Sequence, residues 1–442
     1  MHAHGDTRIT RSVLPSGLRV ITEPMPHLRS VALGVWVGVG SVDEPQSLAG
    51  ATHYLEHWLF RRTRKRTGPE INKLIDGAGG LLNAFTSKEF TCYYARTLDD
   101  DLDLALDVLG DIVTEPSLTT ADFEAERQVI GEELAMAGDD PADAVHELFA
   151  EALFGDHPLA RPILGTEESV ESLSRNQVAG WFRRRYTPPR IVVTAVGNVD
   201  HGHVVAQVRK HLANLLERHD DAEPESPRQV SRHRVPTGTE GIAPLIERRP
   251  TEQAHVLLGM PGLPRVHTER MPLSVVNAVL GGGLSSRLFA DIREARGLAY
   301  SVFSYTNSFV DGGSVGVYAG CQPERVVEVV DRVRGHIDDI ARNGISQAEL
   351  DLAKGSMRGS LVLGAEDPGS RMMRLGKSEL VYPDYRCTDE LLAGVDEVTL
   401  ERANAVAAEV LSQPPVLAAV GPFRNRRSIA GAHRRSRREG SR

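Results

Sequence analysis

The sequence predicts an α+β protein made of two similar domains. Its 442 residues exceed what a single hydrophobic core usually supports. Segments typical of strands and helices alternate along both halves, and short patterns of the first half recur in the second. A stretch without periodicity, rich in Pro, Glu, Arg and Gly, separates the halves. These observations predict a first domain at 1–220, a linker at 221–243 and a second domain at 244–425.

The first half opens with two predicted strands. Residues 18–22 and 31–39 are rich in β-branched and apolar side chains and are flanked by Gly and Pro. Apolar residues then recur at helical spacing from 50 to 60, and a second helix is predicted at 69–76 because a Gly-rich turn ends it. The remaining predicted elements are a hairpin at 81–96 and helices at 102–112, 119–136 and 143–154.

The second half repeats parts of this pattern. Residues 256–259 resemble residues 31–34. Residues 348–351 fall where 121–124 lie in the first half, after a similar helix predicted at 325–340. Such internal similarity is typical of a duplicated domain, so we expect two related halves.

Composition and charge exclude several classes of protein. No apolar run approaches the ~20 residues that a membrane span needs, so we expect no membrane partner. The formal net charge of −9 argues against a nucleic-acid partner, because general nucleic-acid binders need an excess of Lys and Arg. The exception is the Arg-rich C-terminus, which predicts a basic, disordered tail at 426–442.

Cysteine usage and the N-terminus bear on location. Three widely spaced cysteines, Cys92, Cys321 and Cys387, suit neither a disulfide framework nor a cysteine-based zinc site. The polar N-terminus, Met1 to Arg11, lacks the apolar stretch of a secretory signal. Both observations favour a cytoplasmic protein with reduced thiols.

One segment carries a metal-binding pattern. His53-Tyr54-Leu55-Glu56-His57 has the spacing H-x-x-E-H, which on a helix places both histidines one turn apart on one face. Glu56 leans over the same face, where its carboxylate can take a proton from a water. This is the arrangement of an inverted zincin. The pattern also arises by chance, and surface His-Glu-His clusters occur. A further ligand is therefore needed to distinguish a metal site from such a cluster.

The third ligand must come from elsewhere in the chain, because catalytic zinc usually takes three protein ligands and leaves a fourth position open. The predicted helix at 119–136 offers carboxylates. Glu126 and Glu133 are seven residues apart and share a face, whereas Glu132 points elsewhere. The candidates for the third ligand therefore lie around Glu133.

The chain resembles the pitrilysin/insulinase family of zinc metallopeptidases. It is most similar to the small bacterial members that are like the mitochondrial processing peptidase, from about Leu14 to Gly421. The resemblance implies two similar domains, each a mostly antiparallel sheet covered by helices, that form a clamshell. The motifs that carry the resemblance are residues 53–57, 83–86, 126–133, 154–158, 281–289 and 293–300.

The resemblance implies roles for individual residues of the first half. His53, His57 and Glu133 would bind Zn²⁺. Glu56 would be the general base that activates a water. Glu126 would support the site by orienting a metal ligand, without binding the metal itself. The implied reaction is hydrolysis of peptide bonds by a zinc metalloendopeptidase.

The resemblance also implies how a peptide substrate is held. Asn83 and Ala84 match an edge strand that pairs with an extended peptide by strand addition. Arg293 and Tyr300 match the Arg and Tyr that stabilise the developing oxyanion. Outside the resemblance, an Arg on a helix is usually a solvated charge and a Tyr in an apolar strand is usually a core residue. Substrates would be unfolded or short peptides, because they must enter a closed chamber and become a strand.

Four residues near the histidines depart from the family's pattern. Thr52 stands where small residues such as Ala are common, and Trp58 replaces Met or Leu. The pair Arg61-Arg62 stands where Lys-Gly or a similar pair is frequent. None of these is an implied ligand, so they bear on substrate preference more than on catalysis.

Two alternatives belong to other classes of protein. A non-catalytic scaffold or partner subunit of the family typically lacks a histidine or the base, whereas this chain has both histidines and Glu56. A metal-binding module without hydrolysis has no use for a base beside the metal. Because the family's chamber needs more domains than one chain of this length supplies, the resemblance also implies a homodimer or a heterodimer with a related chain.

Overall fold

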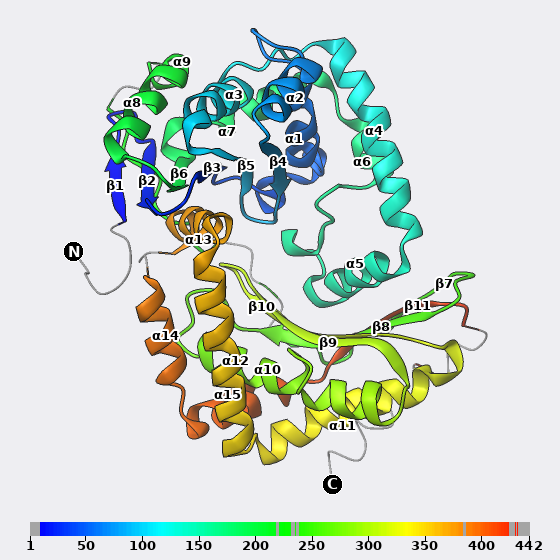
Figure 1. Cartoon of the computed structure of the whole chain (residues 1–442). Helices are drawn as coiled ribbons and strands as arrows, with labels where there is room; N and C mark the ends of the chain where they lie inside the picture. The colour runs from blue at the N-terminus through cyan, green and yellow to red at the C-terminus, as the bar shows by residue number, and fades with distance from the viewer. Residues whose placement is uncertain are drawn as a thin grey trace. The chain divides into compact units, whose positions relative to one another are not determined.

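The structure is a computed structural model of the whole chain (Figure 1). The residues that it describes are 9–217, 221–230, 238–382 and 386–423, with the single residues 235, 429 and 431. Apart from the last two, the basic tail predicted at 426–442 lies outside the described residues. Among the described residues, no helix has both the length and the apolar character needed to cross a membrane.

The first compact unit is built on a six-stranded sheet with the order β1-β2-β6-β3-β5-β4. Its strands are β1 (Thr10–Val13), β2 (Arg19–Pro24), β3 (Ser30–Val37), β4 (Leu81–Thr86), β5 (Thr91–Leu98) and β6 (Ile191–Gly197). Neighbouring strands are antiparallel except for β2 and β6. The structure confirms the two predicted strands and the predicted hairpin. β4 lies at the edge of the sheet.

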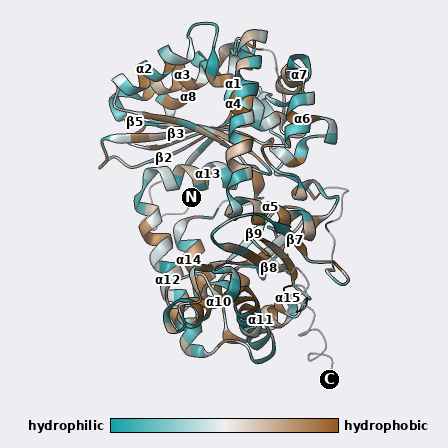
Figure 2. Cartoon of the chain, turned by 90° about the vertical axis from the view of Figure 1, so that its right-hand side faces the viewer, coloured by the Kyte–Doolittle hydropathy of each residue, from teal (hydrophilic) through white to brown (hydrophobic). Residues whose placement is uncertain are grey.

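Helices cover both faces of this sheet. On one face lie helices that share a hydrophobic core with the strands: α1 (Ala51–Arg61), α3 (Leu102–Thr114), α7 (Arg175–Arg185) and α8 (His201–His211). On the other face lies α13 (Pro368–Val381), which packs on β3 and β6. A Cβ atom added at Gly376 would lie 2.0 Å from the Trp36 ring, so glycine allows α13 to approach β3. The hydrophobic residues concentrate in the strands and on the helix sides that face them (Figure 2).

The second compact unit is built on a five-stranded sheet with the order β7-β11-β8-β10-β9. Its strands are β7 (Leu245–Arg248), β8 (Ala254–Gly262), β9 (Ala299–Ser308), β10 (Gly313–Cys321) and β11 (Val416–Gly421). All neighbours are antiparallel except β7 and β11. The core on one face includes residues of α10 (Arg270–Leu280), α11 (Val326–Asn343) and α15 (Leu400–Leu411). α5 (Pro141–Phe154) packs on β8 and β11.

The units exchange helices between the two halves of the sequence. The first unit consists of the described residues of Met1–Leu134, Pro162–Gln229 and Val362–Asp389, and the second of the remainder. α5 therefore packs on the second sheet although it is encoded before the linker, and α13 packs on the first sheet. This division differs from the contiguous domains expected at 1–220 and 244–425, because each sheet takes a helix from the other half to cover one face.

The two halves are related element by element. The long helix α4 (Thr120–Asp139) precedes α5, and the equally long α12 (Gln347–Glu366) precedes α13. In both helix pairs, 227 residues separate the corresponding first residues. At this offset the second half has Ala353 and Ser360 where the first has Glu126 and Glu133. The predicted repeat is confirmed, and its second copy lacks the carboxylates.

Candidate metal centre

The histidine motif lies on α1, which begins after Gly50. Gly50 has a left-handed backbone (φ 88°), and a Cβ atom there would lie 2.7 Å from the carbonyl oxygen of Leu164. The buried carboxylate of Glu44 accepts hydrogen bonds from the backbone N–H groups of Gly50 (2.9 Å) and Thr52 (2.6 Å). This carboxylate satisfies donors at the helix N-terminus and complements the helix dipole. The turn that carries His53 is thereby fixed.

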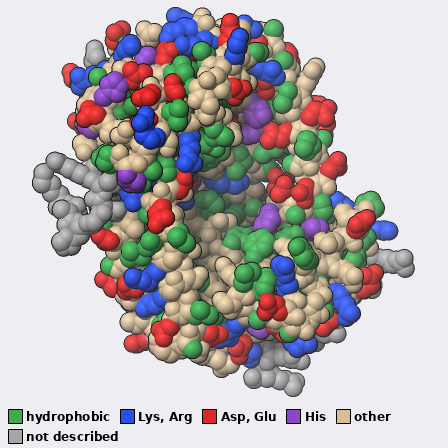
Figure 3. All heavy atoms as spheres, viewed as in Figure 1, with side chains coloured by type: hydrophobic (Ala, Val, Ile, Leu, Met, Phe, Trp, Pro, Cys, Tyr) green, Lys and Arg blue, Asp and Glu red, His purple; other side chains and the backbone are tan. Residues whose placement is uncertain are grey.

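His53, His57 and Glu133 converge on one point. Their ligand atoms all lie within 4.8 Å of one another. Oε2 of Glu133 lies 3.6 Å from Nε2 of His53 and 3.3 Å from Nε2 of His57. No other group of three or more His, Cys, Asp or Glu side chains in the described ranges is arranged to hold a metal ion. Figure 3 shows histidine and acidic side chains gathered over α1 and α4.

This donor set fits zinc. Two imidazole nitrogens and one carboxylate oxygen are a common ligand set of catalytic zinc sites. Oε2 of Glu133 is buried and has no hydrogen-bond partner among the described residues, an arrangement that a bound cation relieves. Burial, with the nearby His57, lowers the pKa of His53 to about 4. The His53 imidazole is therefore neutral near pH 7, which is the form that binds a metal.

Glu56 is held beside this cluster by the edge strand. Its Oε2 accepts a hydrogen bond of 2.5 Å from the hydroxyl of Thr86, the last residue of β4. Burial raises the pKa of Glu56, and the Thr86 hydrogen bond opposes that rise. Sequence reasoning included Thr86 in a motif but gave it no role, because the contact joins a helix and a strand 30 residues apart.

Glu126 contacts the side of the His57 ring that faces away from Glu133. Its Oε2 lies 3.3 Å from Nδ1 of His57, and its Oε1 accepts a hydrogen bond from Nε of Arg61. The carboxylate is buried, whereas Glu132 is exposed. The structure therefore brings both predicted carboxylates of α4 to the same histidine. Arg61 was not among the predicted site residues.

A pocket with a volume of about 590 Å³ opens beside Glu56 and His57, within the first unit. Phe60, Leu82 and Val129 line it with apolar side chains, and the predicted substrate-binding residues Asn83 and Ala84 also line it. In the described chain the β4 edge is paired only with β5, with Asn83 opposite Tyr94 and Ala84 opposite Tyr93. The free edge of β4 thus borders the pocket.

Arg293 and Tyr300 lie together in the second unit. Arg293 belongs to the π-helical segment Phe289–Ala295, and Tyr300 lies near the start of β9. The guanidinium carbon of Arg293 is 4.5 Å from the centre of the Tyr300 ring and 4.8 Å from that of Phe289. Tyr300 is 77% exposed, so it is not a core residue. The role of this pair toward a substrate stays a prediction.

Comparison with known families identifies the family to which the chain belongs. The protein-family model described as insulinase (peptidase family M16) matches residues 19–167. A second family model, described as the peptidase M16 inactive domain, matches residues 172–357. The chain belongs to the insulinase family of peptidases, and it is of the small bacterial type. The second match begins before the linker and extends into the second half, where it includes Ala353, the residue at the position that corresponds to Glu126.

Similar proteins of known sequence share nearly the whole chain. An uncharacterized zinc protease of Streptomyces coelicolor is 47% identical over 96% of this chain and 92% of its own length. One of Mycobacterium leprae is 48% identical over 95% of this chain and 93% of its own length. One of Bacillus subtilis is 37% identical over 94% of this chain and 99% of its own length. These names support a metallopeptidase at the level of the family.

Two solved structures share the fold. A protease from Helicobacter pylori has a TM-score of 0.86 at 22% identity, covering 94% of this chain and 100% of that chain. A peptidase M16 inactive domain from Pseudomonas fluorescens has a TM-score of 0.83 at 19% identity, covering 94% and 98%. The predicted α+β fold with two mostly antiparallel sheets is confirmed.

Proposed function

We propose that this chain is a zinc-dependent endopeptidase that hydrolyses peptide bonds in unfolded or short peptides. The observation that carries the proposal is the convergence of His53, His57 and Glu133, with Glu56 held beside them by Thr86. The names of its relatives as zinc proteases support the choice of metal.

The proposed ligand atoms are Nε2 of His53, Nε2 of His57 and Oε2 of Glu133. When bound, zinc would supply a Lewis acid that polarises the scissile carbonyl and makes a water more acidic. The low pKa of His53 supports this assignment, because a neutral imidazole needs no proton release to bind a metal.

Glu56 is the proposed general base. Thr86 occupies Oε2 of this carboxylate, which leaves Oε1 to accept a proton from the attacking water. The same oxygen then gives the proton to the departing amine nitrogen. Burial raises the pKa of Glu56, and a carboxylate with a raised pKa is a stronger base while it remains ionised.

The proposed substrate site is the free edge of β4. An extended peptide can add to this edge through main-chain hydrogen bonds, which give affinity without strict dependence on side chains. A folded protein cannot offer such a strand, so unfolded or short peptides are the expected substrates. The pocket beside Glu56 and His57 would receive a side chain of the bound peptide.

Two further parts of the proposal rest on the family resemblance. Arg293 and Tyr300 would donate hydrogen bonds to the developing oxyanion, and their exposed, mutually contacting side chains are compatible with that role. The chain would act in a closed chamber completed by a second chain, either a copy of itself or a related one.

The test compares the native chain with Glu56→Gln and with Glu132→Gln, a matched exposed glutamate on α4. We expect about one zinc per chain in all three proteins, since none of the ligands is altered. Cleavage of unstructured peptides should be blocked by a chelator and fall at least about 100-fold in Glu56→Gln, but not in Glu132→Gln. Cleavage that survives in Glu56→Gln would contradict the mechanism. Zinc without cleavage in the native chain would favour the partner-subunit alternative.

A further inference from the structure

We infer that Arg61 is a positioning residue of the metal centre, which acts through Glu126 on His57. Arg61 is the last residue of α1 and lies one turn after His57. Its Nε donates a hydrogen bond to Oε1 of Glu126, whose Oε2 lies 3.3 Å from Nδ1 of His57. On the other side of the same ring, Nε2 lies 3.3 Å from Glu133. The inference rests on the zinc site proposed above.

Glu126 needs a partner in this position. Its side chain is only 5% exposed, and a buried carboxylate is costly unless charged or hydrogen-bonding groups compensate it. Within the described residues, Arg61 and His57 are the polar side chains that contact it. Each contacts a different carboxylate oxygen, so the two contacts together fix the carboxylate plane. Without Arg61, one oxygen loses its partner and the carboxylate can rotate away from His57.

The carboxylate in turn controls the histidine. The orientation and tautomer of a metal-binding imidazole are set by the group that its second nitrogen contacts. A carboxylate facing Nδ1 favours the proton on that nitrogen, which leaves the lone pair of Nε2 free for the metal. Arg61 is therefore expected to influence metal affinity although it lies away from the ligand atoms.

The chain offers a matched control in the next residue. Nε of Arg62 donates a hydrogen bond of 3.0 Å to Asp122, one turn before Glu126 on α4. The exposed fractions of the two arginine side chains are similar, 40% for Arg61 and 43% for Arg62. The second partner of Asp122 is the hydroxyl of Thr119, not a ligand. Losing Arg62 therefore removes a comparable ion pair, between α4 and the residue that follows α1, without disturbing His57.

The experiment measures zinc affinity by competition with a chelator for the native chain, Arg61→Gln and Arg62→Gln. We expect Arg61→Gln to weaken zinc binding about 10- to 100-fold, the usual cost of losing a group that orients a ligand. Arg62→Gln should stay within about twofold of the native chain. The absorption spectrum of the Co²⁺-substituted protein should change in Arg61→Gln only. Equal affinities for the native chain and Arg61→Gln, or equal losses in both variants, would overturn the inference.

A double-variant comparison tests the route through Glu126. In a Glu126→Gln background, Arg61→Gln should change zinc affinity by less than about twofold, because the group it acts through is already lost. Full additivity would overturn the inference. Arg61→Lys should restore part of the affinity. If Arg61→Gln folds poorly, Arg61→Met keeps the aliphatic stem and repeats the test with the same outcomes.

Peptide cleavage separates this inference from the proposed function. In Arg61→Gln saturated with zinc, kcat should fall, because His57 is held less firmly in its orientation, and KM should also change, because Arg61 lines the pocket beside Glu56 and His57. A native chain that binds zinc but cleaves no peptide would contradict the proposed function, and the affinity comparison would still decide the role of Arg61. A native chain that binds no zinc would contradict both.

Discussion

At the scale of single residues, the start of α1 depends on a buried charge. Glu44 is 4% exposed, and its buried carboxylate accepts two backbone hydrogen bonds at the first turn of α1. Gly50 at the helix start has no side chain that could serve instead. Because His53 directly follows Thr52, the position of the first proposed metal ligand depends on Glu44.

We expect Glu44→Ala to lower the free energy of unfolding by about 2–4 kcal/mol, because buried N–H donors lose their acceptor. Glu44→Gln should cost less, since its amide oxygen can still accept one of the two hydrogen bonds. Thermal and denaturant unfolding of the apo proteins measures both effects. The control, Glu132→Ala at an exposed position, should change stability by less than about 0.5 kcal/mol. A similar small change in Glu44→Ala would contradict a capping role.

The predicted site residues and the contacts that were not predicted differ in one physical respect. Helical spacing, a local property, puts His53 and His57 on one face and Glu126 and Glu133 on another, and only the family resemblance implied that the two faces meet, as they do in the structure. Arg61 contacts Glu126, which lies 65 residues away in the sequence, and Thr86 contacts Glu56, which lies 30 residues away. Such contacts depend on how elements pack, and no periodicity in one segment reveals them.

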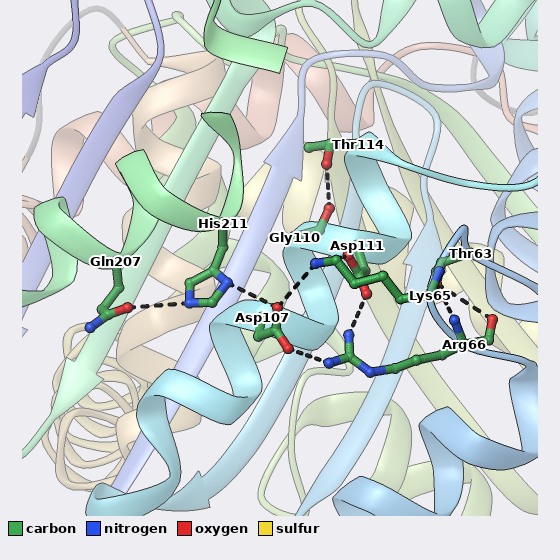
Figure 4. Close-up of polar contacts among 9 residues, drawn as sticks. All are labelled: Thr63, Lys65, Arg66, Asp107, Gly110, Asp111, Thr114, Gln207 and His211. Atoms are coloured by element: carbon green, nitrogen blue, oxygen red, sulfur yellow. Dashed lines mark hydrogen bonds and ion pairs between the residues drawn. The ribbon is translucent and has the colours of Figure 1, made fainter. Parts of the chain in front are cut away.

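At the scale of elements, a polar network anchors the loop that follows α1 (Figure 4). Arg66 donates hydrogen bonds to Asp107 and Asp111, one turn apart on α3. Nζ of Lys65 lies 2.7 Å from Asp111, and Nδ1 of His211 at the end of α8 lies 2.9 Å from Asp107. The network therefore joins α3 and α8 to the loop between α1 and α2 (Gly68–Gly77).

We expect Asp111→Asn to lower the free energy of unfolding by about 3 kcal/mol, because it removes the charge from a buried ion pair and leaves Arg66 with Asp107 alone. Asp111 is only 2% exposed. The matched control on the same helix is Asp103→Asn, whose pair with His203 is about half exposed and should contribute less than about 1 kcal/mol. Unfolding in denaturant measures both variants. Equal small losses would show that burial of Asp111 adds nothing.

The helices themselves were largely predictable, but their partners were not. The helices expected at 102–112, 119–136 and 143–154 are found at Leu102–Thr114, Thr120–Asp139 and Pro141–Phe154. An apolar face, recognised from periodicity, indicates that a helix packs against a hydrophobic core. It does not identify the sheet that the helix packs on, so the exchange of α5 and α13 was not predicted.

At the scale of the whole molecule, the first unit is incomplete without residues from the second half of the chain. α13 covers Trp36, which is 1% exposed, and Arg371 of α13 forms an ion pair with the fully buried Glu23 of β2. Without α13, this face of the sheet would expose its apolar core and leave Glu23 without that counter-charge. A large exposed apolar face favours aggregation.

The exchange predicts that the first half cannot fold independently, although it contains every proposed zinc ligand. A fragment of residues 1–229 should aggregate or unfold without a cooperative transition, because α13 supplies Met372, Leu375, Leu380 and Val381 of the core around Trp36. Co-expression with residues 230–442, which supply α13, should restore a soluble complex that binds zinc. Adding Glu23→Gln and Trp36→Ser to the fragment, to make the uncovered face more polar, should raise its solubility. Calorimetry and zinc content measure these outcomes. A fragment of 1–229 that unfolds cooperatively alone would show that α13 is dispensable, and the sequence boundary at 220 would then mark an autonomous domain.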